Sequence, residues 1–144
     1  MASRLQNMPA LEYAVDASRL LCPEAYRASD DETFGSIVYR RVEGEKAIEH
    51  LFWGPYLPLP AGVYILTFNG ELRGRLTIEF AAKSGGLRLS SAIVEDFARS
   101  LCFVLRRAVD DFEIRGVTTP ALHFLRLDSV LLRCVYASEG DNGR

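Results

Sequence analysis

Apolar and polar residues alternate along most of the chain, and a period of two is the pattern of a β-strand with one buried face. The clearest case is residues 75–80, where leucine, isoleucine and phenylalanine occupy one face and arginine, threonine and glutamate the other. No segment keeps helical spacing for long, so the pattern predicts an all-β domain. The predicted strands cover residues 12–15, 36–41, 48–53, 63–68, 75–80, 87–91, 101–105, 112–115, 122–127 and 130–135.

Turn signals separate these strands at intervals of about ten residues, which is typical of an antiparallel β-sandwich or jelly roll. Residues 54–62 hold three prolines, which exclude a helix and indicate an extended crossing segment or an edge strand. Asn69-Gly70 predicts a type I′ hairpin turn, and Gly85-Gly86 and Asp128-Ser129 predict two further turns. We therefore expect an antiparallel β-sandwich of the jelly-roll type.

The length of 144 residues suits one domain. We expect a flexible or docking arm at residues 1–11, a single β-sandwich over residues 12–136, and a polar tail at residues 137–144.

Residues 54–68, with the sequence GPYLPLPAGVYILTF, resemble a stretch of bacterial jelly-roll domains of the galactose-binding-like type. Those domains are often attached to glycosyltransferases and other proteins of cell-surface polysaccharide. Residues 112–115 and 125–133 are similar to the closing strands of such modules, so the resemblance covers roughly residues 36–135. It implies a jelly roll and, as in many members, glycan binding. Other members are purely structural, and a fold alone does not assign a function.

Composition and charge narrow the classes of partner. The 17 basic and 19 acidic residues give a net charge of −2, without the basic excess that binding to nucleic acid normally requires. No apolar run approaches the roughly 20 residues that span a bilayer, so we expect no membrane insertion. The first residues lack the apolar stretch of a secretory signal, and we expect a cytoplasmic protein or one assembled into a particle inside the cell.

The three cysteines, Cys22, Cys102 and Cys134, are expected to be free thiols that behave as small, buried apolar residues.

The inventory of reactive side chains favours a protein that is not an enzyme. The two histidines, His50 and His123, lie far apart in the sequence, and no nucleophile, zinc or phosphate-loop motif is present. Nothing in the spacing of the acidic residues selects a catalytic pair. The runs Asp30-Asp31-Glu32 and Asp110-Asp111 offer oxygen ligands that leave room for a structural calcium, but their spacing is not diagnostic. We predict no metal site and no cofactor.

Glycan binding needs an exposed aromatic ring and polar groups beside it, and residues 50–56 hold the best candidates. His50, Trp53 and Tyr56 lie within this window. Because a sandwich buries one face of each strand, Trp53 is either a core residue or a ligand platform. Tyr56 follows a proline and either packs against the end of the sandwich or contacts the ligand.

Four further residues are candidate ligand contacts. Tyr26 and Arg27 form an aromatic–cation pair in a loop, where the alternative is a solvated loop. Arg40 could bind acidic sugars or phosphate, or it could be a charged strand end that prevents aggregation. Arg115 shares a polar strand face with Glu113, and the two could simply form an ion pair.

Two functions follow from this reasoning. The first is a non-catalytic carbohydrate-binding module that recognises bacterial surface or capsular polysaccharide. The alternative is a structural spike, fibre or decoration protein of a phage-like particle or surface assembly, which can itself bind host glycan. In that alternative the arm at residues 1–11 docks onto partner proteins or further copies of the chain.

Overall fold

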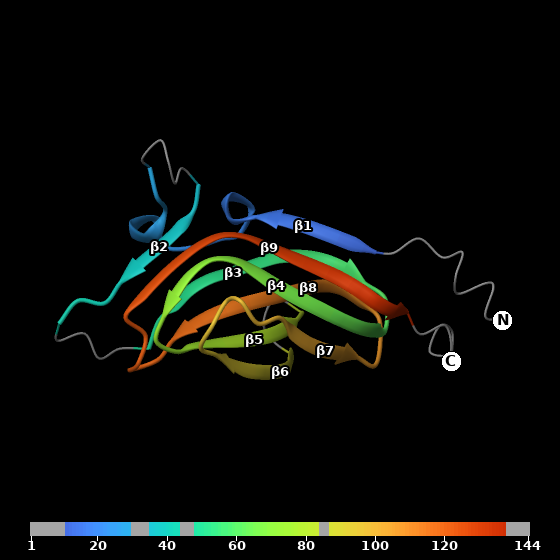
Figure 1. The fold of residues 1–144 in the computed structure, drawn as a ribbon. Coiled ribbons are helices and arrows are strands. Elements are labelled where there is room, and N and C mark those ends of the chain that lie inside the picture. The colour runs from blue at the N-terminus through green and yellow to red at the C-terminus, as the bar shows by residue number, and fades with distance from the viewer. Residues whose placement is uncertain (1–10, 30–34, 44–47, 84–86, 138–144) are drawn as a thin grey trace.

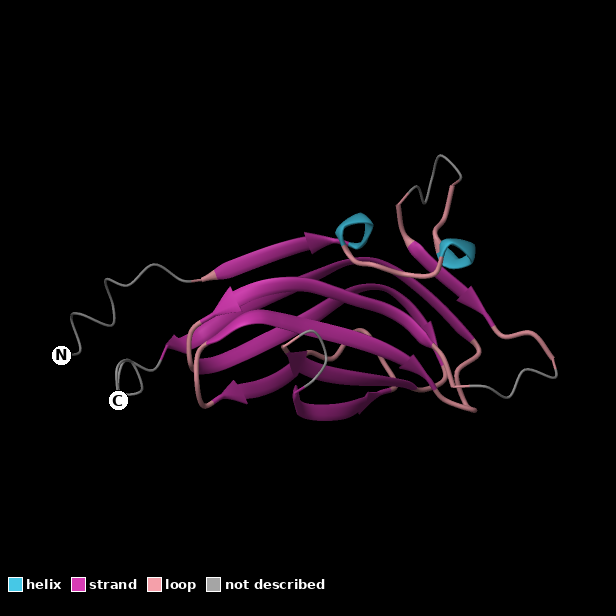
Figure 2. Ribbon diagram, turned by 180° about the vertical axis from the view of Figure 1, so that it is seen from behind, coloured by secondary structure: helices cyan, strands magenta, loops and turns pink. Residues whose placement is uncertain are grey.

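Two antiparallel sheets lie face to face in the computed structural model, which describes residues 11–29, 35–43, 48–83 and 87–137 (Figure 1). In these residues, sheet A has the order β1-β9-β4-β7, with β2 also paired to β9, and sheet B has the order β3-β8-β5-β6. Figure 2 shows the same two layers from behind. The strands are β1 (Glu12–Asp16), β2 (Ile37–Arg40), β3 (His50–Leu59), β4 (Gly62–Arg73), β5 (Leu76–Ala82), β6 (Leu87–Val94), β7 (Leu101–Leu105), β8 (Val109–Thr118) and β9 (Phe124–Ala137).

The strands pair in a nested order. β5 pairs with β6, β4 with β7, β3 with β8, and β1 and β2 with β9. This nesting is what results when one long hairpin is rolled up so that its two halves cover each other. The predicted all-β antiparallel sandwich is confirmed. The nested order is compatible with the predicted jelly roll, while the likeness to galactose-binding-like domains stays a prediction.

Stacked aromatic rings fill the space between the sheets. Phe103 of β7 stacks on Tyr64 of β4, at 5.3 Å between ring centroids, within sheet A. The same ring stacks on Phe80 and Phe112 of sheet B, at 4.4 and 5.2 Å. All four rings are buried. The stack therefore fixes the distance and orientation of the two sheets, because displaced rings lose both apolar burial and ring–ring contact.

Two of the predicted turns are wrong. β4 continues through Asn69-Gly70 and β9 continues through Asp128-Ser129. Asn69 pairs with Ser129 and Gly70 pairs with Leu127, so Asp128 is an extra residue in a β-bulge. A side chain at Gly70 would place its Cβ 1.9 Å from the carbonyl oxygen of Arg126, which explains the glycine without a turn.

The bulge marks the point where β9 changes its neighbour on the outer edge of sheet A. β2 pairs with residues 124–127 of β9, and β1 pairs with residues 129–133. Asp128 lies between these two stretches, and its carboxylate accepts a hydrogen bond of 2.7 Å from the hydroxyl of Ser36, which precedes β2. The bulge residue thus connects β9 to the segment that leads into β2.

The chain between β1 and β2 leaves sheet A and passes along the free edge of β3. Leu21 and Trp53 exchange two backbone hydrogen bonds of 2.8 and 2.9 Å there. The guanidinium group of Arg27 holds this crossing segment, because it donates to the carbonyl oxygens of Ala17, at 2.7 Å, and Gly35, at 2.8 Å, and to that of Leu20. The segment also contains two short 3₁₀ helices, η1 (Ala17–Arg19) and η2 (Glu24–Tyr26).

Parts of several predictions lie outside the described residues. These include residues 1–10 of the predicted arm, residues 138–144 of the predicted tail, and the predicted turn at Gly85-Gly86. The carbonyl oxygen of Leu11 accepts a hydrogen bond of 2.8 Å from the backbone of Cys134 in β9. Within the described ranges, no helix is both long and apolar enough to span a bilayer.

The three cysteines are free thiols in different surroundings. Cys134 is buried and Cys22 is partly buried, but Cys102 is exposed, so the predicted burial is wrong for that residue. Cys102 precedes Phe103 on β7, and because Phe103 points into the core, Cys102 points out of the sandwich. Burial raises the pKa of the Cys22 thiol.

Replacement of Gly116 by alanine tests the packing between β3 and β8. A Cβ at this position would lie 2.1 Å from the ring of Phe52, which is fully buried. We expect Gly116→Ala to lower the free energy of unfolding in urea by about 2 kcal/mol through overpacking. Combination with Phe52→Leu should recover part of that loss, since leucine removes the ring atoms that clash. Additive effects of the two substitutions would contradict this explanation.

Replacement of Arg27 by alanine tests the crossing segment. The substitution leaves three carbonyl oxygens without their donor, so we expect it to lower the free energy of unfolding by about 2 kcal/mol. Arg40→Ala is the matched control, because Arg40 lies nearby on β2 and packs its guanidinium 4.7 Å above the ring of Phe124. We expect the control to cost about 0.5 kcal/mol. Equal losses for the two variants would show that Arg27 has no special role.

Candidate functional site

The outer face of sheet B brings together polar and aromatic side chains from four strands. The register aligns Trp53 of β3 with Arg115 of β8, and Arg115 with Glu79 of β5. Glu79 in turn lies opposite Ser91 of β6, and Leu21 of the crossing segment extends the row beyond Trp53. Directly opposed side chains on one face of a sheet lie close enough to interact. Five residues far apart in the sequence therefore form one continuous row.

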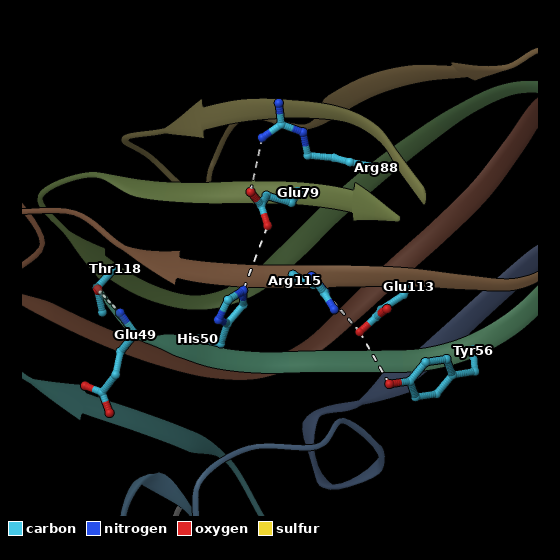
Figure 3. A network of polar contacts seen from close by, with 8 residues as sticks. All are labelled: Glu49, His50, Tyr56, Glu79, Arg88, Glu113, Arg115 and Thr118. Carbon is cyan, nitrogen blue, oxygen red and sulfur yellow. Dashed lines mark hydrogen bonds and ion pairs between the residues drawn. The ribbon is translucent and has the colours of Figure 1, made fainter. Parts of the chain in front are cut away.

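Two parallel rows lie on either side of this central row. We call the outer surface made by the three rows the sheet B platform. One flanking row contains Pro55, Glu113, Ala81 and Arg88, and the other contains His50, Val117, Thr77 and Ile93. Figure 3 shows how the charged members and Tyr56 lie with respect to one another.

Glu79 occupies the middle of the platform and has a basic side chain on each side. Its carboxylate lies 3.6 Å from Arg88 and 4.0 Å from the imidazole of His50 (Figure 3). The side chains of Arg88 and His50 are at least half exposed, so these contacts add little to stability. These contacts instead place hydrogen-bond donors and acceptors next to one another at the surface.

Glu113 is a buried carboxylate on the same face, with only 1 % of its surface exposed. Its Oε2 accepts from Nε of Arg115 at 3.1 Å and from the hydroxyl of Tyr56 at 3.3 Å (Figure 3). The predicted ion pair of Glu113 with Arg115 is present, and it joins two residues of β8 rather than residues on neighbouring strands. A carboxylate on the polar face of a strand is expected to be solvated, but this one is buried because Arg115 and Tyr56 lie against it. Its Oε1 has no hydrogen-bond partner among the described residues.

Tyr56 reaches Glu113 from an unusual backbone conformation. Its φ of 65° lies in the left-handed region, which is uncommon for an aromatic residue and is found preferentially where function constrains the chain. Burial and the neighbouring Glu113 carboxylate raise the pKa of Tyr56, so its hydroxyl stays protonated and donates at neutral pH.

Arg115 is held by the buried Glu113 on one side, and part of its guanidinium group is accessible to solvent on the other. Nε is directed at the buried Glu113, whereas the two terminal nitrogens form no hydrogen bond or ion pair with the described residues. About a quarter of the side chain is exposed, at 26 %. A guanidinium group fixed in this way presents its remaining N–H donors with little loss of side-chain entropy on binding.

Trp53 is a surface residue of the platform. Phe52 points into the core and is fully buried, and Trp53 points the other way and is partly exposed. Of the two alternatives for Trp53, the structure thus gives the position that a ligand platform needs. Contact with a ligand stays a prediction.

The structure separates the predicted site residues into two groups. His50, Trp53 and Arg115 belong to the platform, and Tyr56 borders it. Tyr26, Arg27 and Arg40 line a separate shallow hollow of about 310 Å³ beside β2.

The second group is largely engaged inside the molecule. The hydroxyl of Tyr26 donates to both carboxylate oxygens of Glu49, at 2.8 and 2.7 Å, and its ring meets the ring of Tyr39 edge-on. Arg27 holds the crossing segment, and Arg40 packs on Phe124. We therefore do not place these three residues in the candidate site.

Several platform residues escaped the sequence analysis, chiefly Glu79, Arg88 and Ser91. Their polar positions in alternating strands were visible in the sequence. Their place on the same surface as Trp53 depends on which strands are neighbours and in which register, and a single sequence does not carry that information.

The described residues bring no group of three or more His, Cys, Asp and Glu side chains into metal-binding distance. The pair Asp110-Asp111 thus acquires no third ligand of these types within that part of the chain. The other predicted source of calcium ligands, Asp30-Asp31-Glu32, lies outside it.

Comparison with known proteins supports the fold. No family model and no curated protein sequence matches this chain. Its structure is similar to a chain of the Glycosylation Associate Protein (Gap123) complex from Streptococcus agalactiae, with a TM-score of 0.62 and 9 % sequence identity. The similarity covers 88 % of this chain and 26 % of that chain. At this identity the likeness shows the β-sandwich fold alone.

Proposed function

We propose that the protein is a non-catalytic carbohydrate-binding module and that the sheet B platform is its binding surface. The observation that supports this most is the central row, which places the partly exposed ring of Trp53 directly beside Arg115, with Glu79 next to Arg115 on the following strand. An aromatic ring flanked by fixed hydrogen-bonding groups is the combination that a sugar requires, because one side of a pyranose is apolar and its rim carries hydroxyl groups.

Each group has a definable task in this proposal. The indole of Trp53 stacks on the C–H face of a sugar ring. The free N–H groups of Arg115 donate to ring or hydroxyl oxygens, and the carboxylate of Glu79 accepts from sugar hydroxyls. Arg88 and His50 lie on either side of Glu79 and extend the set of donors along the platform.

The charges of the platform favour a ligand rich in hydroxyl groups. Three potentially cationic side chains, Arg88, Arg115 and His50, face two carboxylates, Glu79 and Glu113, and each carboxylate already has a cationic neighbour. Such a surface does not depend on ligand charge for affinity. Bacterial surface or capsular polysaccharide presents hydroxyl-rich rings in long repeats, and repeats allow several weak contacts to act together. The likeness in fold to a chain of a glycosylation-associated complex is in keeping with this proposal.

Replacement of Trp53 by alanine tests the stacking role. We expect the variant to lose roughly tenfold or more in affinity for the polysaccharide that the wild type binds, because the apolar area of the indole that a sugar covers contributes about 1.5–3 kcal/mol. The measurement is a glycan array that identifies a ligand, followed by calorimetric titration of wild type and variant.

Tyr136→Ala is the matched control for that experiment. Tyr136 is also an exposed aromatic residue, at 53 %, but it lies on β9 of sheet A. Its removal should leave the affinity unchanged. Loss of binding in Tyr136→Ala with full binding in Trp53→Ala would move the binding surface to the other sheet and overturn the proposal.

Replacement of Glu113 by glutamine tests whether Glu113 acts by positioning Arg115. We expect Glu113→Gln to weaken binding about threefold to tenfold, since a hydrogen bond from a charged group loses about 1 kcal/mol when its acceptor becomes neutral. In the background of Arg115→Ala the same substitution should have no further effect on affinity. Unfolding curves check that both variants stay folded. Additive losses in the double variant would show that Glu113 acts on the ligand independently of Arg115.

A further inference from the structure

We propose that two copies of the chain pair through the free edge of β7, antiparallel to each other, so that two sheets A join into one continuous sheet. β7 is the last strand in the order of sheet A and pairs with β4 alone. Among the described residues, no backbone hydrogen bond other than this ladder involves residues 101–105. One side of β7 therefore presents unpaired N–H and C=O groups, which is a template for another strand.

The sequence of β7 lacks the features that normally protect such an edge. Its residues, LCFVL, include no charged side chain and no proline. The other edge strands each carry protection: β3 holds Pro55 and Pro58 and is covered by the crossing segment, and β6 carries Arg88. β1 and β2 contain charged residues at their ends. Charges and prolines on edge strands prevent pairing between molecules, so their absence from β7 singles out this edge.

β7 is held rigidly from the inside. Phe103 belongs to the ring stack between the sheets, and Leu105 is buried. Val104 points outward and is 62 % exposed. A rigid extended strand pairs with a second one at little cost in conformational entropy.

The apolar surface continues from the edge onto the outer face of sheet A. Val104 lies opposite Val63 of β4, and Val63 lies opposite Tyr136 of β9, which is also exposed. Cys102 lies opposite Ile65 in the neighbouring row. A partner strand at the β7 edge would therefore contact the side chain of Val104 as well as backbone groups.

The charges at the two ends of β7 indicate that the strand that pairs with this edge belongs to a second copy of the chain. Arg106 and Arg107 follow the strand and form no ion pair within the described part of the chain. A hollow of about 490 Å³ precedes it, lined in part by Asp96, by Arg99 and by Glu95, whose carboxylate is paired with Arg75 at 2.8 Å. Antiparallel pairing about a twofold axis brings Arg106 and Arg107 of each copy to the end of the other that carries Asp96, and it does so twice. An interface in which one surface complements itself is typical of a twofold dimer.

The contact is small, because five residues form the strand, and we expect a weak dimer. Sedimentation equilibrium of the full chain, at loadings up to roughly 100 μM, should show masses rising from the single-chain value of 16.1 kDa towards twice that value. Val104→Lys adds a charge to the edge of each copy and should raise the dissociation constant by roughly tenfold or more.

Val42→Lys is the matched control. Val42 has nearly the same exposure, 63 %, and follows β2, which pairs with β9 and lies away from β7 in sheet A. It should dimerise like the wild type. A wild type that stays at the single-chain mass, a Val104→Lys variant that dimerises unchanged, or a Val42→Lys variant that loses the dimer would each overturn the proposal. Circular dichroism confirms that all three proteins are folded.

Cross-linking provides a second measurement on the same edge. Cys102 is the exposed thiol and adjoins the centre of β7, so a short bis-maleimide should join two copies through it. Cys102→Ser should abolish the cross-link without changing the sedimentation result. Cross-links that persist in Cys102→Ser would show that the copies meet elsewhere. The inference does not depend on glycan binding, since Val104→Lys leaves the sheet B platform intact.

Discussion

Contact between the inner faces of the two sheets governs the rest of the structure. Rings from both sheets meet at Phe103, and their burial requires every strand to turn its apolar side inward. Once the inner faces are fixed in this way, the residues that alternate with the buried ones along each strand must point outward. Trp53, Arg115 and Glu79 are among these residues. The site is thus a consequence of how the core packs, because a one-residue slip in any strand would exchange its two faces.

The sequence predicted the faces of the strands better than their ends. The alternation in residues 75–80 and 101–105 was confirmed, since period two is a direct result of strand geometry. The two predicted turns at Asn69-Gly70 and Asp128-Ser129 failed for one shared reason. They lie opposite each other in the β4–β9 pair, where a bulge also favours glycine and short polar residues. Turn and bulge make similar demands on the local sequence, and only the partner strand distinguishes them.

The candidate site was predictable in part for a related reason. Trp53 and Arg115 could be selected from their residue types and their strands. Glu79 could not be selected, because its relation to them depends on the register of β5 with β8. Arg27 shows the opposite failure: its residue type suggested a ligand contact, but its partners are backbone carbonyl oxygens, which no sequence pattern marks. Residue type identifies candidates, whereas topology decides which of them meet.

The two outer faces of the sandwich have different chemistry, and the difference suggests how they act together. The sheet B platform carries charged side chains around one partly exposed aromatic ring, whereas the outer face of sheet A beside β7 carries Val104, Val63 and Tyr136. Pairing through β7 would use an edge of sheet A and leave both platforms open. In the proposed function a single shallow platform would bind one sugar weakly, and two platforms on one dimer would raise the effective concentration of the second contact on a repeating polymer. An edge without protective charges, which is a hazard in a monomer, would then be the means by which a weak sugar contact gains useful strength.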